Sequence, residues 1–318
     1  MTGGAGFIGS NWVRHRLSRS DDRITVFDAL TYAGVRESLS EFDDDPRFTF
    51  VEGDICDRGA VGAALPGHEA VVHFAAESHV DRSLLDPDVF VRTNCSGTNV
   101  LCDVAVDAEV QRFVHISTDE VYGSIDEGSF VETDPLAPRS PYSAAKAGSD
   151  LIALAYHETH GLPVLVTRSS NQFGPYQFPE KLIPFFVTSL LEGERVPLYG
   201  DGLHVRDWLY VEDNCAGVDL VLESGKVGEI YNIGGGNELT NVEVTSRVLA
   251  LLDRDDSWVD HVADRLGHDR RYSIDTTKVQ ALGWRPTRDF DDALAATVDF
   301  YRSRRDWWEP LRQRVRNR

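Results

Sequence analysis

The chain opens with Met1-Thr2-Gly3-Gly4-Ala5-Gly6-Phe7-Ile8-Gly9-Ser10, and the spacing of Gly3, Gly6 and Gly9 predicts its fold. Gly-x-x-Gly-x-x-Gly is a variant of the loop that joins a strand to a helix in dinucleotide-binding proteins. There the first glycine allows a tight turn, the second lets the backbone approach a pyrophosphate, and the third lets the helix pack close to the sheet. The helix that follows directs the positive end of its dipole at the phosphates.

The sequence after this loop alternates short apolar strands with amphipathic helices. This alternation indicates right-handed βαβ units, and hence a parallel sheet with helices on both faces. We therefore expect an α/β protein with a Rossmann-like, doubly wound parallel sheet in residues 1–170 and a smaller mixed α/β domain in residues 171–318. A helix-then-strand pattern at about residues 208–234 predicts that this segment returns to the first domain. The predicted strands are Ile24–Asp28, Phe48–Glu52, Ala70–Phe74, Arg112–Ser117 and Pro163–Thr167, and the helices between them are Asn11–Ser18, Gly59–Leu65, Asp88–Val106 and Ala144–His160.

The start of the chain is short for this fold. A glycine loop of this kind follows the central strand of the sheet, yet only Met1 and Thr2 precede Gly3. A strand needs roughly five residues, and losing the central one leaves its neighbours with unpaired backbone groups. We expect the natural chain to begin several apolar residues upstream; a shortened first strand is the alternative.

The composition excludes several classes of protein. The chain has 318 residues, of which 42% are hydrophobic, so it is not a disordered acidic tail. Its formal net charge of −20 disfavours nucleic acid as a partner, because phosphate binding needs a positive face. Only 4 of the 32 basic residues are Lys, whereas 33 of the 52 acidic residues are Asp. This bias suits a salt-rich cytoplasm, where ions screen self-repulsion, and predicts a halophilic protein; an ordinary acidic protein is the alternative.

The cysteines and apolar runs indicate a compartment. The four cysteines, Cys56, Cys95, Cys102 and Cys215, have no spacing typical of a metal site. We therefore expect no metal, and a reducing compartment. No apolar run is long enough to cross a membrane, and no signal peptide precedes the glycine loop. The sequence thus predicts a cytoplasmic protein with no membrane partner.

Polar residues follow the predicted strands at the edge where doubly wound folds bind ligands. Asp28 ends the strand after the glycine loop, where a carboxylate can hold the hydroxyls of an adenosine ribose. The same charge would repel a 2′-phosphate, which favours NAD over NADP. Asp54 and Ile55, after the next strand, are placed to meet the adenine.

Two further motifs carry chemistry. Tyr142-x-x-x-Lys146 places a phenol and an ammonium on one face of a helix. A nearby cation, aided by the charge of NAD⁺, favours the phenolate. Tyr142 can then take a hydroxyl proton while hydride leaves the same carbon for the nicotinamide. The second motif, Thr118-Asp119-Glu120, directly follows an apolar strand.

These motifs, in this order, resemble the extended short-chain dehydrogenase/reductases, and within them the dTDP-glucose 4,6-dehydratases. The resemblance implies a nucleotide-diphosphate sugar as substrate, NAD as cofactor and, since relatives are typically dimers, a homodimer. It covers nearly the whole chain and rests on Thr2–Asn11, Ala75–Ser83, the Thr-Asp-Glu triplet, Pro141–Lys146, Gly174–Pro184, Val205–Trp208 and Gly267–Tyr272.

The implied reaction is that of a lyase, the dehydration of dTDP-glucose to a 4-keto-6-deoxy sugar. Transient oxidation at C4 by bound NAD makes the C5 proton acidic, and Glu120 would remove it. Asp119, held protonated, would donate to the departing C6 hydroxyl before hydride returns to C6, and Thr118 would hydrogen-bond the C4 oxygen. Two carboxyl groups with different roles need pKa values that their surroundings push apart.

The resemblance also implies the ligand-binding residues. Lys181 and Arg206 suit a diphosphate. The NAD site would comprise Gly3, Gly6, Phe7, Ile8, Gly9, Asp28, Ala29, Leu30, Thr31, Asp54, Ile55, Phe74, Ala75, Ala76, Glu77, Ser78, Thr93, Tyr142, Lys146 and Gln172. The nucleotide-sugar would meet Ser78, Thr118, Asn171, Lys181, Leu182, Pro197, Leu198, Tyr199, Arg206, Asn241, Asp264, Arg265, Gly267 and His268.

Four positions depart from the family pattern, and other functions stay open. Gln172 and His204 stand where Asn is common, Phe173 stands where Tyr is usual, and Leu266 replaces a usual Pro. The alternatives are a related NAD-dependent UDP-sugar dehydratase, decarboxylase or 4-epimerase, and an NAD-binding regulator without turnover. The acid pair argues against the decarboxylase and the epimerase. The sequence does not separate thymidine from uridine, because one methyl group is worth only about 1–3 kcal/mol.

Overall fold

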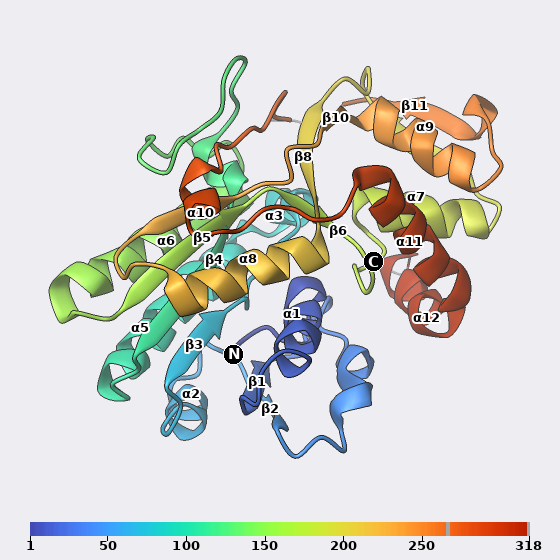
Figure 1. Ribbon diagram of the computed structural model, residues 1–318. Coiled ribbons are helices and arrows are strands. Elements are labelled where there is room, and N and C mark those ends of the chain that lie inside the picture. Colours follow the sequence, from blue (N-terminus) through green and yellow to red (C-terminus); the bar gives the residue numbers. More distant parts are fainter. Residues whose placement is uncertain (265–267, 317–318) are drawn as a thin grey trace.

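The computed structural model describes residues 1–264 and 268–316, and its larger part is a parallel sheet (Figure 1). Strands β3, β4, β5 and β9 pair in that order, and β1 pairs with β2; all these pairs are parallel. Residues at the strand centres are buried on both faces, as expected of a sheet covered by helices. The strands are β1 (Ile24–Asp28), β2 (Phe48–Glu52), β3 (Ala70–His73), β4 (Arg112–Thr118), β5 (Val164–Ser169) and β9 (Ile230–Ile233).

The first residues join the two groups of strands. Thr2 forms parallel bridges with Phe27 of β1 and with His73 of β3. Its amide donates to the carbonyl of Val72 at 3.0 Å, while the amide of Gly3 donates to that of Phe27 at 2.9 Å. The ammonium group of Met1 donates to the carbonyl of Thr25 at 2.7 Å, and its burial lowers the pKa of this group to about 5.

Helices cover both faces of the sheet. On one face α1 (Phe7–Leu17) packs against α8 (Val211–Ser224), and on the other α5 (Thr98–Asp107) lies between α2 (Arg58–Ala64) and α6 (Pro141–His160). Each face has its own apolar cluster. Since α8 packs on α1 and β9 pairs with β5, this later segment is part of the first sheet. The α/β, doubly wound fold predicted from the sequence is confirmed.

The connection from β3 to β4 differs from the prediction. Instead of one helix over Asp88–Val106, the chain forms α3 (Val80–Leu85), α4 (Pro87–Phe90), the π-helical η2 (Val91–Gly97) and then α5. A π turn inserts an extra residue into the helical repeat and is frequent at functional sites. Here it places Thr93 and Asn94 against the ligand cleft described below.

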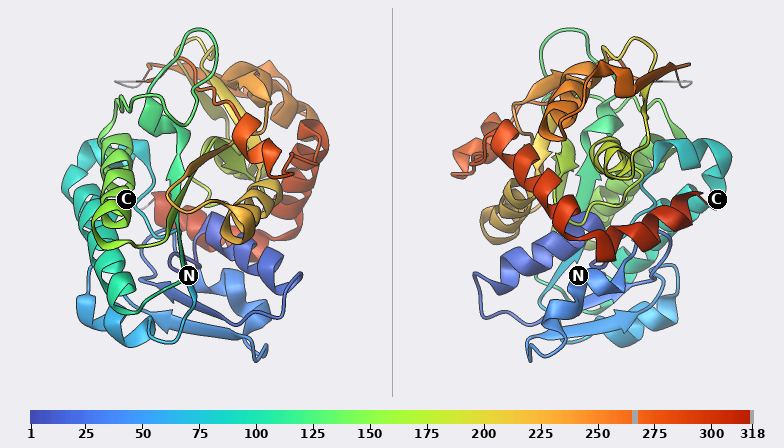
Figure 2. Two further views of the ribbon diagram at one scale, coloured as in Figure 1. Left: turned by 60° about the vertical axis from the view of Figure 1, so that its left-hand side comes forward. Right: turned by 90° about the vertical axis from the view of Figure 1, so that its right-hand side faces the viewer.

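The second part of the molecule lies beside the carboxyl ends of the sheet (Figure 2). Its core packs Phe186, Val248, Leu294 and Trp308 between four helices. The strands form a β10-β8-β6 sheet and a β11-β7 pair. The elements are β6 (Asn171–Phe173), α7 (Leu182–Leu191), β7 (Val196–Tyr199), β8 (Val205–Tyr210), β10 (Glu238–Thr240), α9 (Asn241–Leu251), β11 (Val259–Val262), α10 (Thr277–Ala281), α11 (Phe290–Ser303) and α12 (Arg305–Arg316), and short 3₁₀ turns lie at Arg36–Phe42 (η1), Asp119–Tyr122 (η3) and Asp256–Trp258 (η4).

Among the described residues, none of the helices has the length and apolar character needed to cross a bilayer. The four cysteines are all free thiols, two of them buried.

Candidate active site

A cleft opens at the carboxyl ends of the parallel strands, between the sheet and the second part of the molecule. All five predicted catalytic residues, Thr118, Asp119, Glu120, Tyr142 and Lys146, line it. So do all the predicted NAD-binding residues except Leu30. The sequence therefore placed these side chains correctly around one cavity.

The three glycines of the loop differ in what surrounds them. Gly3 has φ +69°, and a Cβ there would lie 2.4 Å from the amide nitrogen of Ala75. A Cβ on Gly9 would lie 2.3 Å from the carbonyl oxygen of Gly3. A Cβ on Gly6 would meet only that same oxygen, at 3.3 Å. Turn and packing thus require glycine at 3 and 9, whereas Gly6 leaves the loop open toward the cleft.

Asp28 ties the end of β1 to the glycine loop. Its carboxylate accepts from the amide of Ala5 at 2.9 Å and from the amide of Leu30 at 2.8 Å. Burial raises the pKa of Asp28, and these two hydrogen bonds oppose the rise. Leu30 has φ +49° and packs its side chain on the apolar cluster of the sheet. Leu30, predicted to bind NAD, does not line the cleft: its backbone amide orients Asp28, and its side chain packs on the core.

A residue that supports the cleft, Asn94, was not predicted from the sequence. The side chain of Asn94, in the π turn, accepts from the amide of Glu77 at 2.9 Å and donates to the carbonyl of Glu77 at 3.0 Å. Asn94 thereby fixes the segment after β3. Its position next to Thr93, which was predicted to bind NAD, is the one feature of the sequence that could have indicated this role. Further lining residues that the sequence missed are Phe27, Tyr32, Ala33, Gly34, Gly53, Val89, Arg92, Ile116, Ser117, Ser169, Ser170, Gln177, Phe178 and Glu180.

Helix α6 presents the phenol and the ammonium. It begins with Pro141 after Ser140, which forms a capping box with Ser143. Lys146 donates to the carbonyl of Ile116 at 2.6 Å. Burial lowers the pKa of Lys146 to about 8, with Asp150 opposing the shift. The ammonium is therefore poised near neutral pH at the floor of the cleft.

The phenol of Tyr142 is protonated in this environment. Burial raises its pKa, the carboxyl groups of Glu120 and Asp119 raise it further, and a hydrogen bond with Thr118 opposes the rise. Burial thus works against the phenolate that the sequence predicts. Ionisation of Tyr142 therefore requires added positive charge in the cleft, of the kind that an oxidised nicotinamide carries.

The Thr-Asp-Glu triplet lies where β4 ends and η3 begins. The hydroxyl of Thr118 donates to Asp119 Oδ1 at 3.2 Å and accepts from the amide of Glu120 at 3.3 Å. Asp119 is 2% exposed. Burial raises its pKa well above the usual value, and the charges of Glu120 and Asp207 add to this. Burial therefore favours the protonated form of Asp119, which lies beside a second carboxyl group.

A buried polar network supports α6 from behind. Asp150, one turn after Lys146, has its carboxylate 3.2 Å from His115 Nε2. The carboxylate of Asp150 also accepts a hydrogen bond from Arg168 at 2.9 Å. Arg168 also donates to the hydroxyl of Tyr122 at 2.9 Å. Burial lowers the pKa of His115 to about 4, so this imidazole is neutral. The network therefore pairs the carboxylate of Asp150 with the guanidinium of Arg168, and the charge of Asp150 raises the pKa of Lys146.

Part of the predicted nucleotide-sugar set reaches the cleft. Ser78, Thr118, Asn171 and Lys181 line it, and Lys181 donates to the carbonyl of Ser78 at 2.7 Å. Arg206 on β8 lies with its guanidinium 4.2 Å from the ring centre of Tyr272, close enough to lower the pKa of Asp119 by its charge.

The rest of the predicted nucleotide-sugar set lies outside the lining of the cleft. Leu182 begins α7, Asn241 begins α9, and Pro197, Leu198 and Tyr199 lie on β7. Leu198 is buried in the core, whereas Tyr199 is 39% exposed. Asp264 and His268 lie against His204, and Arg265 and Gly267, like Leu266, fall outside the described residues.

Comparison with known proteins identifies the family. The model of the GDP-mannose 4,6 dehydratase family matches residues 1–297. The chain belongs to this family. The resemblance to the dTDP-glucose 4,6-dehydratases, inferred from the glycine loop, the Thr-Asp-Glu triplet and the Tyr-Lys pair, is confirmed by this match and by the relatives that follow.

Relatives within the dehydratase family match over the full length. A dTDP-glucose 4,6-dehydratase of Streptomyces antibioticus is 57% identical over 99% of this chain and 95% of the relative. Low-salt glycan biosynthesis protein Agl12 of Haloferax volcanii is 55% identical over 95% of this chain and 97% of the relative. The crystal structure of DesIV, the dTDP-glucose 4,6-dehydratase of Streptomyces venezuelae with NAD and TYD bound, matches with a TM-score of 0.96 and 57% identity over 98% of both chains.

Proposed function

We propose that this protein dehydrates dTDP-glucose to dTDP-4-keto-6-deoxyglucose, as an NAD-dependent hydro-lyase. The observation that carries the proposal is the buried carboxyl of Asp119 beside Glu120, in the cleft that also holds Tyr142 and Lys146. Exchange of hydride at one carbon needs a single proton-transfer group there. Loss of water across the next carbon–carbon bond needs a base and an acid in addition.

The described residues fit NAD. A side chain at Gly3 or Gly9 would collide with the backbone, whereas Gly6 faces open space where a pyrophosphate can approach. Asp28, at the end of β1, stands where ribose hydroxyls bind and where a 2′-phosphate would be repelled. When bound, NAD supplies the oxidation at C4 and the return of hydride to C6. We propose that residues 1–170 form its domain and residues 171–318 bind the nucleotide-sugar.

The side chains of the cleft divide the proton transfers between them. Tyr142, as the phenolate that the charge of Lys146 stabilises, would take the proton of the C4 hydroxyl. Thr118 holds the C4 oxygen. Glu120 removes the proton from C5, and Asp119 gives its proton to the departing C6 hydroxyl, which leaves as water. When hydride returns to C6, Glu120 would give the proton back to C5. The two carboxyl groups can act in opposite directions because burial favours the protonated form of Asp119.

Incubation with dTDP-glucose and with UDP-glucose tests the substrate. The 4-keto-6-deoxy product absorbs in alkali, and we expect it from dTDP-glucose at the higher kcat/KM. Product from UDP-glucose alone would favour the UDP-sugar dehydratase. Absence of product from both sugars, in protein with NAD bound, would refute the proposal and leave the regulator.

The variant Glu120→Gln tests the division of roles. Without its base at C5, the enzyme should still oxidise C4 but stall before water is lost. Reduced nicotinamide should then accumulate on the enzyme, visible as its near-ultraviolet absorbance, while product formation falls about 100-fold or more. Unchanged turnover would show that Glu120 is not the base.

We also propose that the protein forms a homodimer. Large apolar side chains are exposed on three neighbouring elements: Leu85 on α3 is 87% exposed, Leu151 on α6 59% and Val91 on η2 53%. Both α3 and η2 contact α6, so these side chains belong to one face, and a second copy would cover it.

Leu151→Glu should turn a dimer into a monomer in sedimentation, whereas Leu203→Glu, at another exposed leucine, should not. A monomeric wild-type protein would refute the proposal.

The compartment and the salt requirement are part of the same proposal. We propose that the enzyme works in the cytoplasm of a halophile. The free cysteines fit a reducing compartment, and the Haloferax relative adds support to the halophilic interpretation of the charge. The salt dependence of its stability, treated below, is the test.

A further inference from the structure

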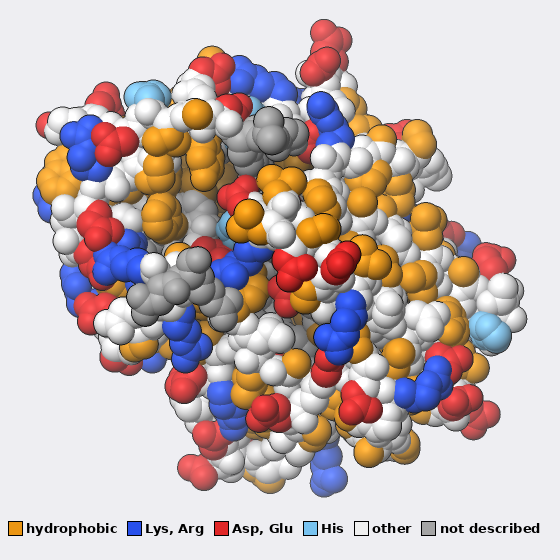
Figure 3. Space-filling view, turned by 180° about the vertical axis from the view of Figure 1, so that it is seen from behind, with side chains coloured by type: hydrophobic (Ala, Val, Ile, Leu, Met, Phe, Trp, Pro, Cys, Tyr) orange, Lys and Arg blue, Asp and Glu red, His pale blue; other side chains and the backbone are white. Residues whose placement is uncertain are grey.

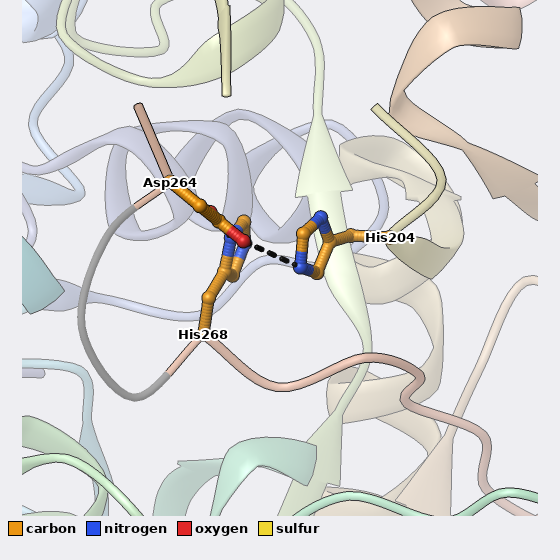
Figure 4. Close-up of side chains that lie close together, drawn as sticks. All are labelled: His204, Asp264 and His268. Atoms are coloured by element: carbon orange, nitrogen blue, oxygen red, sulfur yellow. Dashed lines mark hydrogen bonds and ion pairs between the residues drawn. The ribbon is translucent and has the colours of Figure 1, made fainter. Parts of the chain in front are cut away.

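We propose that His204, Asp264 and His268 bind a divalent transition-metal ion such as Zn²⁺ at the edge of the nucleotide-sugar site. His204 directly precedes β8, whereas Asp264 and His268 follow β11. The fold brings them together (Figure 4). No spacing in the sequence shows this group, because its members come from distant parts of the chain.

The three side chains already converge on one point. The carboxylate of Asp264 lies between the two imidazoles, 2.7 Å from His268 Nδ1 and 3.3 Å from His204 Nε2. One ligand atom from each residue lies within 4.8 Å of the others. Zinc holds imidazole nitrogen at about 2.0–2.1 Å and carboxylate oxygen at about 2.0–2.2 Å. Two ligands of one ion are then about 3 Å apart, so ion binding requires the imidazole of His268 to turn out of its stacked position on His204.

The surroundings hold the ligands in place. The rings of His204 and His268 stack with their centres 3.6 Å apart and an angle of 15° between their planes. His204 is 4% exposed, so its imidazole has little freedom to turn away. Asp264 is 40% exposed at its side chain, which leaves an entry path for the ion from solvent.

The donor set selects the class of metal. Two imidazole nitrogens and one carboxylate oxygen favour Zn²⁺, Co²⁺ or Ni²⁺ over Mg²⁺ and Ca²⁺, which prefer oxygen ligands. Three protein ligands leave at least one coordination position open, as in catalytic zinc sites. An asparagine at position 204, which is common in the family that this chain resembles, would offer no imidazole.

The metal site would also contribute to binding of the nucleotide-sugar, and this part of the inference rests on the proposed function. Asp264 and His268 are among the residues predicted to hold the nucleotide-sugar, and Arg206 lies two residues after His204 on β8. An ion held here would have its open position toward the diphosphate, and a phosphate oxygen could complete its coordination. The metal would add a second cation to Arg206 and strengthen substrate binding without taking part in proton transfer.

Titration with Zn²⁺ alone, against a chromophoric chelator, tests the site without substrate or turnover. We expect one Zn²⁺ per chain at micromolar affinity, weakened at least about 100-fold in His204→Asn. His261→Asn, which removes an exposed histidine of β11, should bind like the wild type. Co²⁺ should give a visible absorption spectrum in the wild type that His204→Asn lacks. Binding weaker than millimolar, or equal binding by His204→Asn and wild type, would overturn the site.

Kinetics with the nucleotide-sugar test the link to the diphosphate. Removal of Zn²⁺ by a chelator should raise KM several-fold in the wild type and change kcat little, whereas His204→Asn should not respond to Zn²⁺. A KM that is the same with and without bound Zn²⁺ would overturn the diphosphate role. An enzyme that binds Zn²⁺ but turns over neither sugar would instead refute the proposed function, so the two failures are distinguishable.

Discussion

Asp119 shows how one residue can carry a proton at a pH where most aspartates have lost theirs. Asp119→Asn keeps the shape of the side chain but has no proton to give, so we expect turnover to fall about 100-fold or more. The stability of this variant, in contrast, should increase relative to the wild type as pH rises. The raised pKa of Asp119 means that the folded wild type binds more protons than the unfolded chain, so it loses stability as pH rises through that range. The variant has no such loss.

Urea unfolding at about pH 5 and pH 8 measures this difference. Relative to the wild type, Asp119→Asn should gain stability at the higher pH, where the pKa shift of the buried acid costs the wild type most. A difference in stability between variant and wild type that is the same at both pH values would show that the folded state does not raise the pKa of Asp119.

Single residues were predictable where a strand end fixes their position. Asp28 and Asp119 each follow a clear apolar strand, and parallel strands deliver their carboxyl ends to one edge of the sheet. Asn94 was missed because its role lies in a hydrogen-bonded contact with Glu77, 17 positions earlier, which no local pattern records. Leu30 lies outside the lining of the cleft because its backbone is left-handed and its side chain packs on the core, which no local pattern of the sequence shows.

At the scale of elements, the packing of α1 on the glycine loop gives a matched pair of variants. In Gly9→Ala the new methyl group would lie 2.3 Å from the carbonyl oxygen of Gly3, so we expect a loss of about 1–3 kcal/mol in unfolding free energy together with weaker NAD binding. In Gly6→Ala the methyl group enters the open cleft, so NAD affinity should fall while stability changes little. Denaturant unfolding and NAD titration measure the two effects. Equal destabilisation by both variants would contradict the different roles of the two glycines.

Helix α6 gives a prediction about pH. The charge of Asp150 supports the ammonium of Lys146, whose pKa burial lowers to about 8. Asp150→Asn removes that charge, so the pKa of Lys146 should fall further and the ammonium should lose its proton at a lower pH. The alkaline limb of kcat/KM should therefore move to lower pH. Ser149→Ala removes a neutral partner of His115 and should leave the limb in place; an unmoved limb in Asp150→Asn would contradict the role of Asp150.

The elements themselves were predictable to within a few residues where periodicity was strong. Strands β1 and β2 have the predicted bounds, and α6 begins three residues earlier than expected because Pro141 and its Ser140 cap open the helix. The connection over Asp88–Val106 was not predictable in this way, because a π turn keeps the apolar pattern of a helix while shifting its register. The group of His204, Asp264 and His268 was equally invisible, since tertiary folding alone assembles it.

At the scale of the whole molecule, the net charge of −20 does not gather in one acidic patch on the face drawn in Figure 3. On the face drawn in Figure 3, Asp and Glu side chains alternate with Arg, Lys and apolar ones. The four lysines fall into two groups. Lys146 and Lys181 line the cleft, whereas Lys226 and Lys278 both pair with Glu229. The proposed substrate is itself an anion, so we expect local cations inside an acidic shell to bind it.

This distribution predicts a protein that needs salt. With 52 acidic and 32 basic residues, self-repulsion opposes the compact state, and the Debye length falls from about 10 Å at 0.1 M to about 3 Å at 1 M salt. We expect Tm to rise by roughly ten degrees or more between 0.1 M and 2 M KCl. Each kcal/mol added to the free energy of unfolding raises Tm by about 2–4 °C in a chain of this size or somewhat smaller. Sorbitol at matched osmolality is the control, because it is excluded from the surface without screening charge. A Tm that KCl leaves unchanged, or that sorbitol raises equally, would show that screening is not what stabilises the acidic surface.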